Sequence, residues 1–142
     1  MSSEGKPKKR LNVTVKRINE EIAHAESHGK RLEMAIKGGQ PHLGFTAPEA
    51  VLAAFGSCIL SNLNKGAAAM DIRIEEARVE FDVEKRFEPL GFESLEYHLI
   101  VKSTAPEEKL KALFERATTN GTATNALLEG LKPKKRLKVI RE

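Results

Sequence analysis

Hydrophobic and polar residues alternate in two short stretches near the start of the chain, at residues 11–17 and 32–36. The apolar positions on one side are Leu11, Val13 and Val15 in the first stretch and Leu32, Met34 and Ile36 in the second. A period of two is typical of β-strands that are buried on one face. A weaker strand near residues 21–26 and the turn-forming Ser-His-Gly-Lys at 27–30 lie between them. The sequence therefore predicts a small meander of three strands.

A nearly continuous apolar run follows a loop that contains glycine and proline. The loop and its exit read GGQPHLGFTAPEA, residues 38–50, and a helix is predicted to begin near Pro48 and Glu49. From Ala50 to Leu60 only one Gly-Ser pair interrupts the apolar residues. A helix that is apolar almost all round belongs in the interior of a protein. We therefore expect a long, buried central helix.

Strand-like alternation returns in two longer stretches, residues 72–83 and 92–103, with the segment EPLGFE between them. The two stretches are predicted to form a long β-hairpin. In the first stretch Ile72 and Ile74 fall in one phase, whereas the other phase carries Val79, Phe81 and Val83. This slip indicates a bulge or a break near residues 75–78.

Two helices and a last strand complete the pattern. Thr104 and Glu107 have the spacing of a capping box, and the Asn120-Gly121 pair ends the helix that they begin. A short helix at 122–129 and a strand at 137–141 follow. The predicted order is three strands, a helix, two strands, two helices and a strand. This order is typical of an α+β fold, because the strands are adjacent in sequence instead of alternating regularly with helices.

A chain of 142 residues is expected to form one domain. We expect this domain to span residues 9–142, after a flexible basic segment at 1–8. A single domain of this size does not cover a nearly all-apolar helix and long two-stranded ribbons by itself, so we expect a homodimer. The start of the chain lacks the apolar region of a signal peptide, and no hydrophobic stretch approaches the roughly 20 residues of a membrane span. With only one cysteine, an internal disulfide is excluded, and we expect a soluble cytoplasmic protein with no membrane partner.

The net charge of +4 comes from the two ends of the chain. Residues 1–17 and residues 132–142 each hold six Lys or Arg and one Glu, and the segment between them is acidic. The string KPKKRL occurs at both ends, each time before a strand-like alternation. Such tails are compatible with binding to nucleic acid, but no aromatic residue is interleaved to stack on bases. We therefore interpret them as solvated lead-ins to strands and do not expect a nucleic-acid partner.

The only cysteine, Cys58, lies in the middle of the most apolar run, AAFGSCILSNLNKGAAAM. On an ideal helix the face of Cys58 carries Phe55 toward the N-terminus and Ser61, Asn62 and Lys65 toward the C-terminus. The thiol therefore lies where an apolar wall meets a polar one. Free cysteine is among the most buried residue types, which favours an inert core residue. A reactive thiol would need a cation or hydrogen-bond donors to lower its pKa, and these residues alone leave both interpretations open.

Glu49 is the other notable residue, a carboxylate at the predicted start of the central helix. Its plain interpretation is a first-turn charge that the helix dipole favours. On one continuous helix Glu49 lies roughly 13.5 Å from Cys58 and on the opposite face, so the two side chains do not touch. Glu49 would therefore influence the thiol only through a basic residue between them or across a subunit interface. The four histidines show no metal-binding spacing with one another or with Cys58, and the glycines near residue 40 form no phosphate-binding motif. We expect neither a metal nor a cofactor.

The segment GGQPHLGFTAPEAVLAAFGSCILSN resembles the signature of the OsmC/Ohr superfamily, in which a buried helix carries a carboxylate and then a peroxidatic cysteine. The matching residues are Glu49, Leu52, Ala53, Ala54, Gly56, Ser57 and Cys58. The predicted order of elements also resembles that fold, β3-α-β2-α2-β. The resemblance implies an intertwined homodimer with its active site at the interface, and the reduction of organic hydroperoxides and peroxides. Cys58 would attack the peroxide as a thiolate and become a sulfenic acid.

The chain departs from this family where a second cysteine normally closes a disulfide. The matching segment is residues 117–128, where Gly121 or Thr122 stands in the place of that cysteine. A sulfenic acid at Cys58 would therefore need a thiol from outside the chain. The arginine that activates the cysteine in this family has no recognisable counterpart here, and Arg17 and Arg31 are the candidates, because a fixed positive charge stabilises a thiolate.

Three functions follow from these observations. The first is a one-cysteine thiol peroxidase in oxidative-stress defence, with Cys58 as nucleophile, Glu49 as the residue that orients an arginine, and Arg17 or Arg31 as activator. The second is a member of the family that has lost turnover and binds a small apolar ligand beside Cys58 at the dimer interface. The third is nucleic-acid binding by the basic tails.

Overall fold

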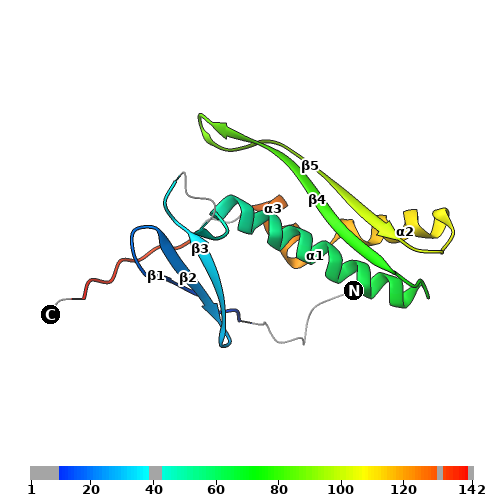
Figure 1. Cartoon of the computed structure of the whole chain (residues 1–142), viewed down its shortest axis with the longest axis horizontal. Helices are drawn as coiled ribbons and strands as arrows, with labels where there is room; N and C mark the ends of the chain where they lie inside the picture. The colour runs from blue at the N-terminus through cyan, green and yellow to red at the C-terminus, as the bar shows by residue number, and fades with distance from the viewer. Residues whose placement is uncertain (1–9, 39–42, 131–132, 141–142) are drawn as a thin grey trace. The chain divides into compact units, whose positions relative to one another are not determined.

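The computed structural model describes residues 10–38, 43–130 and 133–140, and Figure 1 shows the elements along the chain. The predicted flexible segment at 1–8 lies outside the described residues. The backbone forms two compact units, Met1–Val51 and Leu52–Glu142, which are described one at a time. The expectation of one domain over residues 9–142 stays a prediction.

The first unit contains an antiparallel sheet of three strands in the order β1-β2-β3. The strands are β1 (Thr14–Arg17), β2 (Ile22–Ser27) and β3 (Lys30–Ala35). A two-residue turn joins β2 to β3, and its residues His28 and Gly29 have φ angles of 50° and 74°. Positive φ at both positions is the geometry that matches the twist of a hairpin. The predicted meander and its turn are thus confirmed.

The long helix α1 (Ala47–Ala69) begins one residue before the predicted start. Its buried residues are Phe55, Gly56, Ile59, Leu63, Gly66 and Ala67, which form one stripe at helical spacing. The prediction that the helix is buried all round is wrong for the single chain, because Ala53, Ala54 and Ser57 are exposed. A stripe of this kind is what a helix buries when its neighbours pack on one side of it. Neither α1 nor any other helix in the described part of the chain is long and apolar enough to cross a membrane.

The second unit contains the predicted β-hairpin, formed by β4 (Glu76–Phe87) and β5 (Leu90–Lys102). Phe81 pairs with Tyr97 in the register of the two strands. A bulge or a break was predicted near residues 75–78, and the break is found there, because β4 begins at Glu76. The β-bulge lies farther along, between Glu84 and Lys85.

Two helices follow the hairpin, α2 (Glu107–Thr119) and α3 (Thr122–Glu129). The predicted capping box at the start of α2 is wrong: Pro106 is the N-cap, and no side chain caps it. Ser103 organises the preceding turn instead, since its hydroxyl donates to the Arg73 carbonyl and accepts from the Ala105 N–H.

The last strand, predicted at 137–141, does not form. Residues 133–140 have no regular secondary structure, and residue 141 lies outside the described part. A strand requires a hydrogen-bonded neighbour, and in the two described sheets β2 pairs with β1 and β3, and β4 pairs with β5. The described residues thus form three strands, a helix, two strands and two helices, and the α+β class is confirmed.

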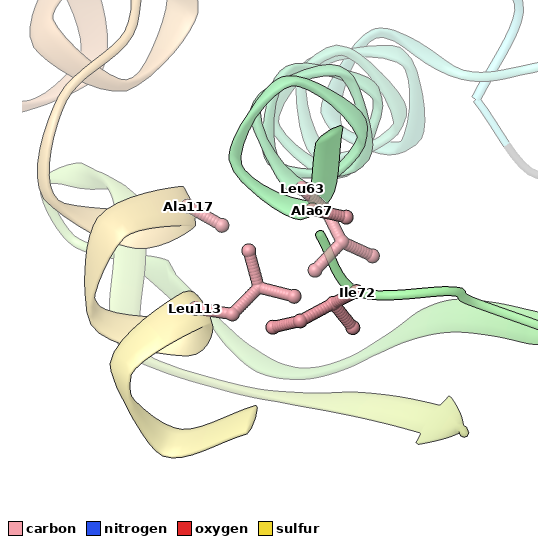
Figure 2. Packing of buried hydrophobic residues seen from close by; sticks show 5 residues of the cluster. All are labelled: Leu63, Ala67, Ile72, Leu113 and Ala117. Carbon is pink, nitrogen blue, oxygen red and sulfur yellow. The ribbon is translucent and has the colours of Figure 1, made fainter. Parts of the chain in front are cut away.

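The core of the second unit joins α1 to α2. Figure 2 shows Leu63 and Ala67 of α1 beside Leu113 and Ala117 of α2, together with Ile72, and all five are buried. A Cβ atom added to Gly66 would lie 2.7 Å from Cδ1 of Leu113. The helices therefore pack closely because position 66 has no side chain.

Candidate functional site

Cys58 lies half-buried on α1, three residues after Phe55. Its Sγ accepts a hydrogen bond from Asn62 Nδ2 at 3.9 Å and another from Thr124 Oγ1 at 3.8 Å. Asn62 shares a helical face with Cys58, as the sequence predicted. Thr124 comes from α3 and is only 2% exposed. The thiol is therefore held between two helices by neutral donors.

The first turn of α3 supplies further hydrogen bonds to the thiol. Burial raises the pKa of Cys58, but backbone hydrogen bonds from Thr124, Ala123 and Thr122, together with the Thr124 hydroxyl, outweigh that effect and bring the pKa below its usual value. The first N–H groups of a helix have no partner within the helix and carry its positive dipole end. An anion at this position is stabilised, so the site favours the thiolate form of Cys58.

Gly121 permits the close approach of α3. A Cβ atom at this position would lie 2.6 Å from Cys58 Sγ and 2.7 Å from Asn62 Nδ2. These separations are far below van der Waals contact, so any side chain at position 121 would push the start of α3 away from the sulfur. Gly121, one of the two residues predicted to stand in the place of the second cysteine, thus lies directly against Cys58.

A pair of asparagines fixes the turn that leads into α3. Asn62 Nδ2 donates to the Asn120 carbonyl at 2.7 Å, and Asn125 Nδ2 donates to Asn120 Oδ1 at 2.7 Å. The sequence singled out Asn120 only as a helix stop and did not identify Thr124. The sequence did contain a signal for the backbone donors. A helix was predicted to begin at residue 122, directly after Gly121, and the first N–H groups of a helix are free. These groups lie in the segment that matches the second cysteine of the family.

Glu49 takes part in the N-terminal cap of α1. Its Oε1 accepts from the backbone N–H of Thr46 at 2.9 Å and from the Thr46 hydroxyl at 3.0 Å, and the Glu49 N–H donates to Thr46 Oγ1 at 3.4 Å. This reciprocal arrangement is a capping box. The backbone hydrogen bond from Thr46, and then its hydroxyl, lower the pKa of Glu49. The Glu49 carboxylate therefore has a local role at the start of α1. Its predicted role in orienting an arginine toward Cys58 stays a prediction.

The two candidate arginines lie in the sheet of the first unit. Arg17 is on β1 opposite Ala23, and Arg31 is on β3, where its Nε lies 3.5 Å from Glu26 Oε1. Their action on Cys58 stays a prediction. Within the described residues of the second unit, every group that lowers the pKa of the thiol is uncharged.

An aromatic cluster continues the apolar wall beside Cys58. Phe55 of α1 packs against Phe81 of β4 and Tyr97 of β5, with ring centroids 5.7 Å and 5.5 Å away. Gly56 lets the strand approach, since a Cβ atom there would lie 3.1 Å from the Phe81 ring. Across the described ranges, no three His, Cys, Asp or Glu side chains lie close enough together to hold a metal ion.

The family model for OsmC-like proteins matches residues 38–134. The chain belongs to the OsmC family. The match contains Cys58 and the start of α3, so both parts of the candidate site lie within the family region of this OsmC-like chain. A search of curated protein sequences gives no match.

Solved structures show the same fold at low identity. The OsmC-like protein from Mycoplasma pneumoniae aligns with a TM-score of 0.77 and 19% identity, covering 84% of this chain and 88% of that one. The organic hydroperoxide resistance protein from Elizabethkingia anophelis gives a TM-score of 0.60 and 23% identity over 85% and 89%. The organic hydroperoxide resistance protein OhrB of Bacillus subtilis gives 0.59 and 20% over 82% and 89%. The α+β fold of this chain is therefore the OsmC-like fold.

Proposed function

We propose that this OsmC-like protein is a thiol peroxidase that reduces organic hydroperoxides in cytoplasmic defence against oxidative stress. The observation that carries the proposal is the set of hydrogen bonds that α3 and Asn62 direct at Cys58 Sγ. The thiolate is the nucleophilic form of cysteine, and these donors favour it. The names of the Elizabethkingia and Bacillus proteins, which refer to organic hydroperoxide resistance, support the same class of substrate.

The reaction needs one thiolate, one proton and two equivalents of an external thiol. Sγ of Cys58 attacks one peroxide oxygen, a sulfur–oxygen bond forms, the oxygen–oxygen bond breaks, and the alcohol leaves with a proton. Sulfur is oxidised by two electrons to a sulfenic acid. An external thiol then displaces water to form a mixed disulfide, and a second one releases Cys58 and leaves as the external disulfide. No second cysteine in the chain takes part, because Cys58 is the only one.

The surroundings of Cys58 suit a hydroperoxide with an organic group. Phe55 lies one helical turn before the cysteine and belongs to the aromatic cluster with Phe81 and Tyr97. Phe55 is itself buried, so the gain would come from the alkyl or aryl group, whose own apolar surface would leave water beside the sulfur at about 25 cal/mol per Å². Hydrogen peroxide lacks this group, so we expect the organic substrate to react faster.

The remaining parts of the proposal rest on the family resemblance. A homodimer places its active sites at the interface, where Arg17 or Arg31 would supply a positive charge to the thiolate and Glu49 would orient that guanidinium. Arginine suits this role because its charge is permanent and its donors are arranged as a planar fork.

Sulfenic acid trapping tests the proposal directly. Reduced protein is mixed with cumene hydroperoxide or hydrogen peroxide in the presence of dimedone, and the adduct on Cys58 is measured by mass spectrometry. We expect faster labelling than for free cysteine, faster labelling with cumene hydroperoxide than with hydrogen peroxide, and none in Cys58→Ser. Labelling no faster than that of free cysteine would refute the peroxidase function.

Binding of a small apolar ligand is the second candidate, and the lack of a resolving thiol favours it. This function predicts a bound ligand and an unreactive thiol instead of rapid labelling by dimedone. Native mass spectrometry of the purified protein would show a bound apolar molecule, while Cys58 stays unlabelled by dimedone after peroxide.

A further inference from the structure

Asn62 connects the thiol to the turn between α2 and α3. A side-chain amide has two N–H donors. In this structure the Nδ2 atom of Asn62 makes two contacts, with Cys58 Sγ at 3.9 Å and with the Asn120 carbonyl at 2.7 Å. We propose that Asn62 is a positioning residue, which holds the start of α3 against Cys58 so that its backbone N–H groups face the sulfur. The inference rests on the proposed function in one respect, that Cys58 is the reacting group.

The hydrogen bonds form a short chain across the turn. Asn62 on α1 donates to Asn120, and Asn120 accepts from Asn125 on α3. Asn120 itself has an extended backbone, with φ −146° and ψ 145°, so it ends α2 and lets the chain turn toward α3. Gly121 follows and occupies the space directly beside Cys58 Sγ. The position of α3 relative to the sulfur is thus fixed by polar contacts that begin at Asn62.

Hydrophobic packing contributes little to the placement of α3. Thr124 is its one buried residue, whereas Leu127 and Leu128 are 44% and 76% exposed. By contrast, α2 is anchored to α1 through Leu113 and Ala117, which are 1% and 0% exposed. Loss of the Asn62 amide should therefore release α3 while the core between α1 and α2 stays intact.

The charged side chains on the surrounding elements do not replace this role. The charged residues of these helices are Glu49 and Lys65 on α1, Glu107, Glu108, Lys109, Lys111, Glu115 and Arg116 on α2, and Glu129 on α3. None of them hydrogen-bonds to Cys58 within the described residues, and none contributes to its pKa. On the hairpin, Glu80 and Asp82 alternate with Phe81, and Glu96 and His98 alternate with Tyr97, so these charges lie on the opposite face of the ribbon.

The test compares Asn62→Leu, which keeps the volume and removes both donors, with Asn64→Leu, an exposed position on the same helix. The rate of Cys58 alkylation by iodoacetamide is measured between about pH 6 and pH 10, a range that spans the ordinary thiol pKa. For Asn62→Leu we expect the pKa of Cys58 to rise and alkylation near neutral pH to fall roughly tenfold, while rates above the pKa converge. Asn64→Leu should match the unsubstituted protein.

A second variant keeps the inference testable if Asn62→Leu fails to fold. Asn62→Asp preserves shape and polarity but places an acceptor against both Sγ and the Asn120 carbonyl, so we expect a larger rise in the pKa of Cys58. Circular dichroism checks the fold of each variant. An unchanged pH profile in folded protein, or a loss of rate that is equal at every pH, would overturn the positioning role. No peroxide is used, so inertness toward hydroperoxides would refute the proposed function and leave this result standing.

Discussion

Gly121 and Cys58 act together at the scale of single residues, because the sulfur occupies the space that a side chain at position 121 would need. The φ angle of Gly121 is 169°, an extended backbone that any residue adopts. Glycine is required here for proximity and not for backbone freedom. Gly121 therefore has a role of its own, since it allows the N–H groups of α3 to approach the thiol.

Replacing Gly121 with alanine should move the start of α3 away from Cys58 and weaken the hydrogen bonds that lower its pKa. A lowered pKa means that the thiolate fraction near neutral pH exceeds that of an ordinary cysteine. Gly121→Ala should raise the pKa, so the alkylation rate falls near neutral pH and recovers above the ordinary pKa of about 8.5. Gly38→Ala is the matched control, since a Cβ atom there has nothing within 4 Å. Identical pH profiles for both variants would contradict the steric role of position 121.

The sequence predicted one half of the candidate site and not the other. Cys58 and Asn62 are four residues apart on one helix, and helical periodicity alone places them on the same face. Thr124 lies 66 residues after Cys58, and its approach depends on the contacts that Asn62 and Asn125 make with Asn120 in the turn before α3. No local pattern encodes such a contact. The cation, Arg17 or Arg31, stays a prediction, and the only local sign of the backbone donors was the helix predicted to begin at residue 122 after Gly121.

At the scale of elements, the tetrapeptide Thr-Ala-Pro-Glu lies at the start of two helices, α1 and α2, and its side chains cap only α1. At residues 46–49 it forms a capping box, whereas at residues 104–107 no side chain caps the helix. From the sequence, the box was predicted only at the second copy, although the spacing is the same in both. What differs is the preceding turn, where Ser103 takes the hydrogen bonds at the second copy.

These two copies provide an internal comparison of cap energetics. Thr46→Ala removes a side chain that both donates to Glu49 and accepts from its N–H, and loss of such a cap costs about 1 kcal/mol. Thr104→Ala removes the same atoms from an identical tetrapeptide without a cap, so we expect little change. Urea denaturation of both variants measures the difference. Equal losses of unfolding free energy would show that the Thr46 contacts contribute nothing.

At the scale of the whole molecule, regular elements were predicted well where periodicity is strong and poorly where the outcome depends on neighbours. The helix at 122–129 and the turn at His28-Gly29 match the predictions. Of the strand predicted at 137–141, the described residues 137–140 have no regular structure, although Leu137 and Val139 alternate correctly, since both are exposed and no described strand pairs with them. Alternation shows that a segment is able to join a sheet; it does not supply the partner.

The tip of the β4–β5 hairpin gives the proposed homodimer a test. Phe87 and Leu90 are 72% and 74% exposed there, and contiguous exposed apolar groups mark interaction surfaces. If a second copy covers them, sedimentation equilibrium should give twice the chain mass of 15.7 kDa. Leu90→Glu would bury an unpaired charge at that contact and should shift the protein toward monomer. Ser94→Glu, an exposed position on the same strand, adds the same charge and should stay dimeric. A monomer at every concentration for the unsubstituted chain would contradict the dimer, and a dimer that tolerates Leu90→Glu would place its interface elsewhere.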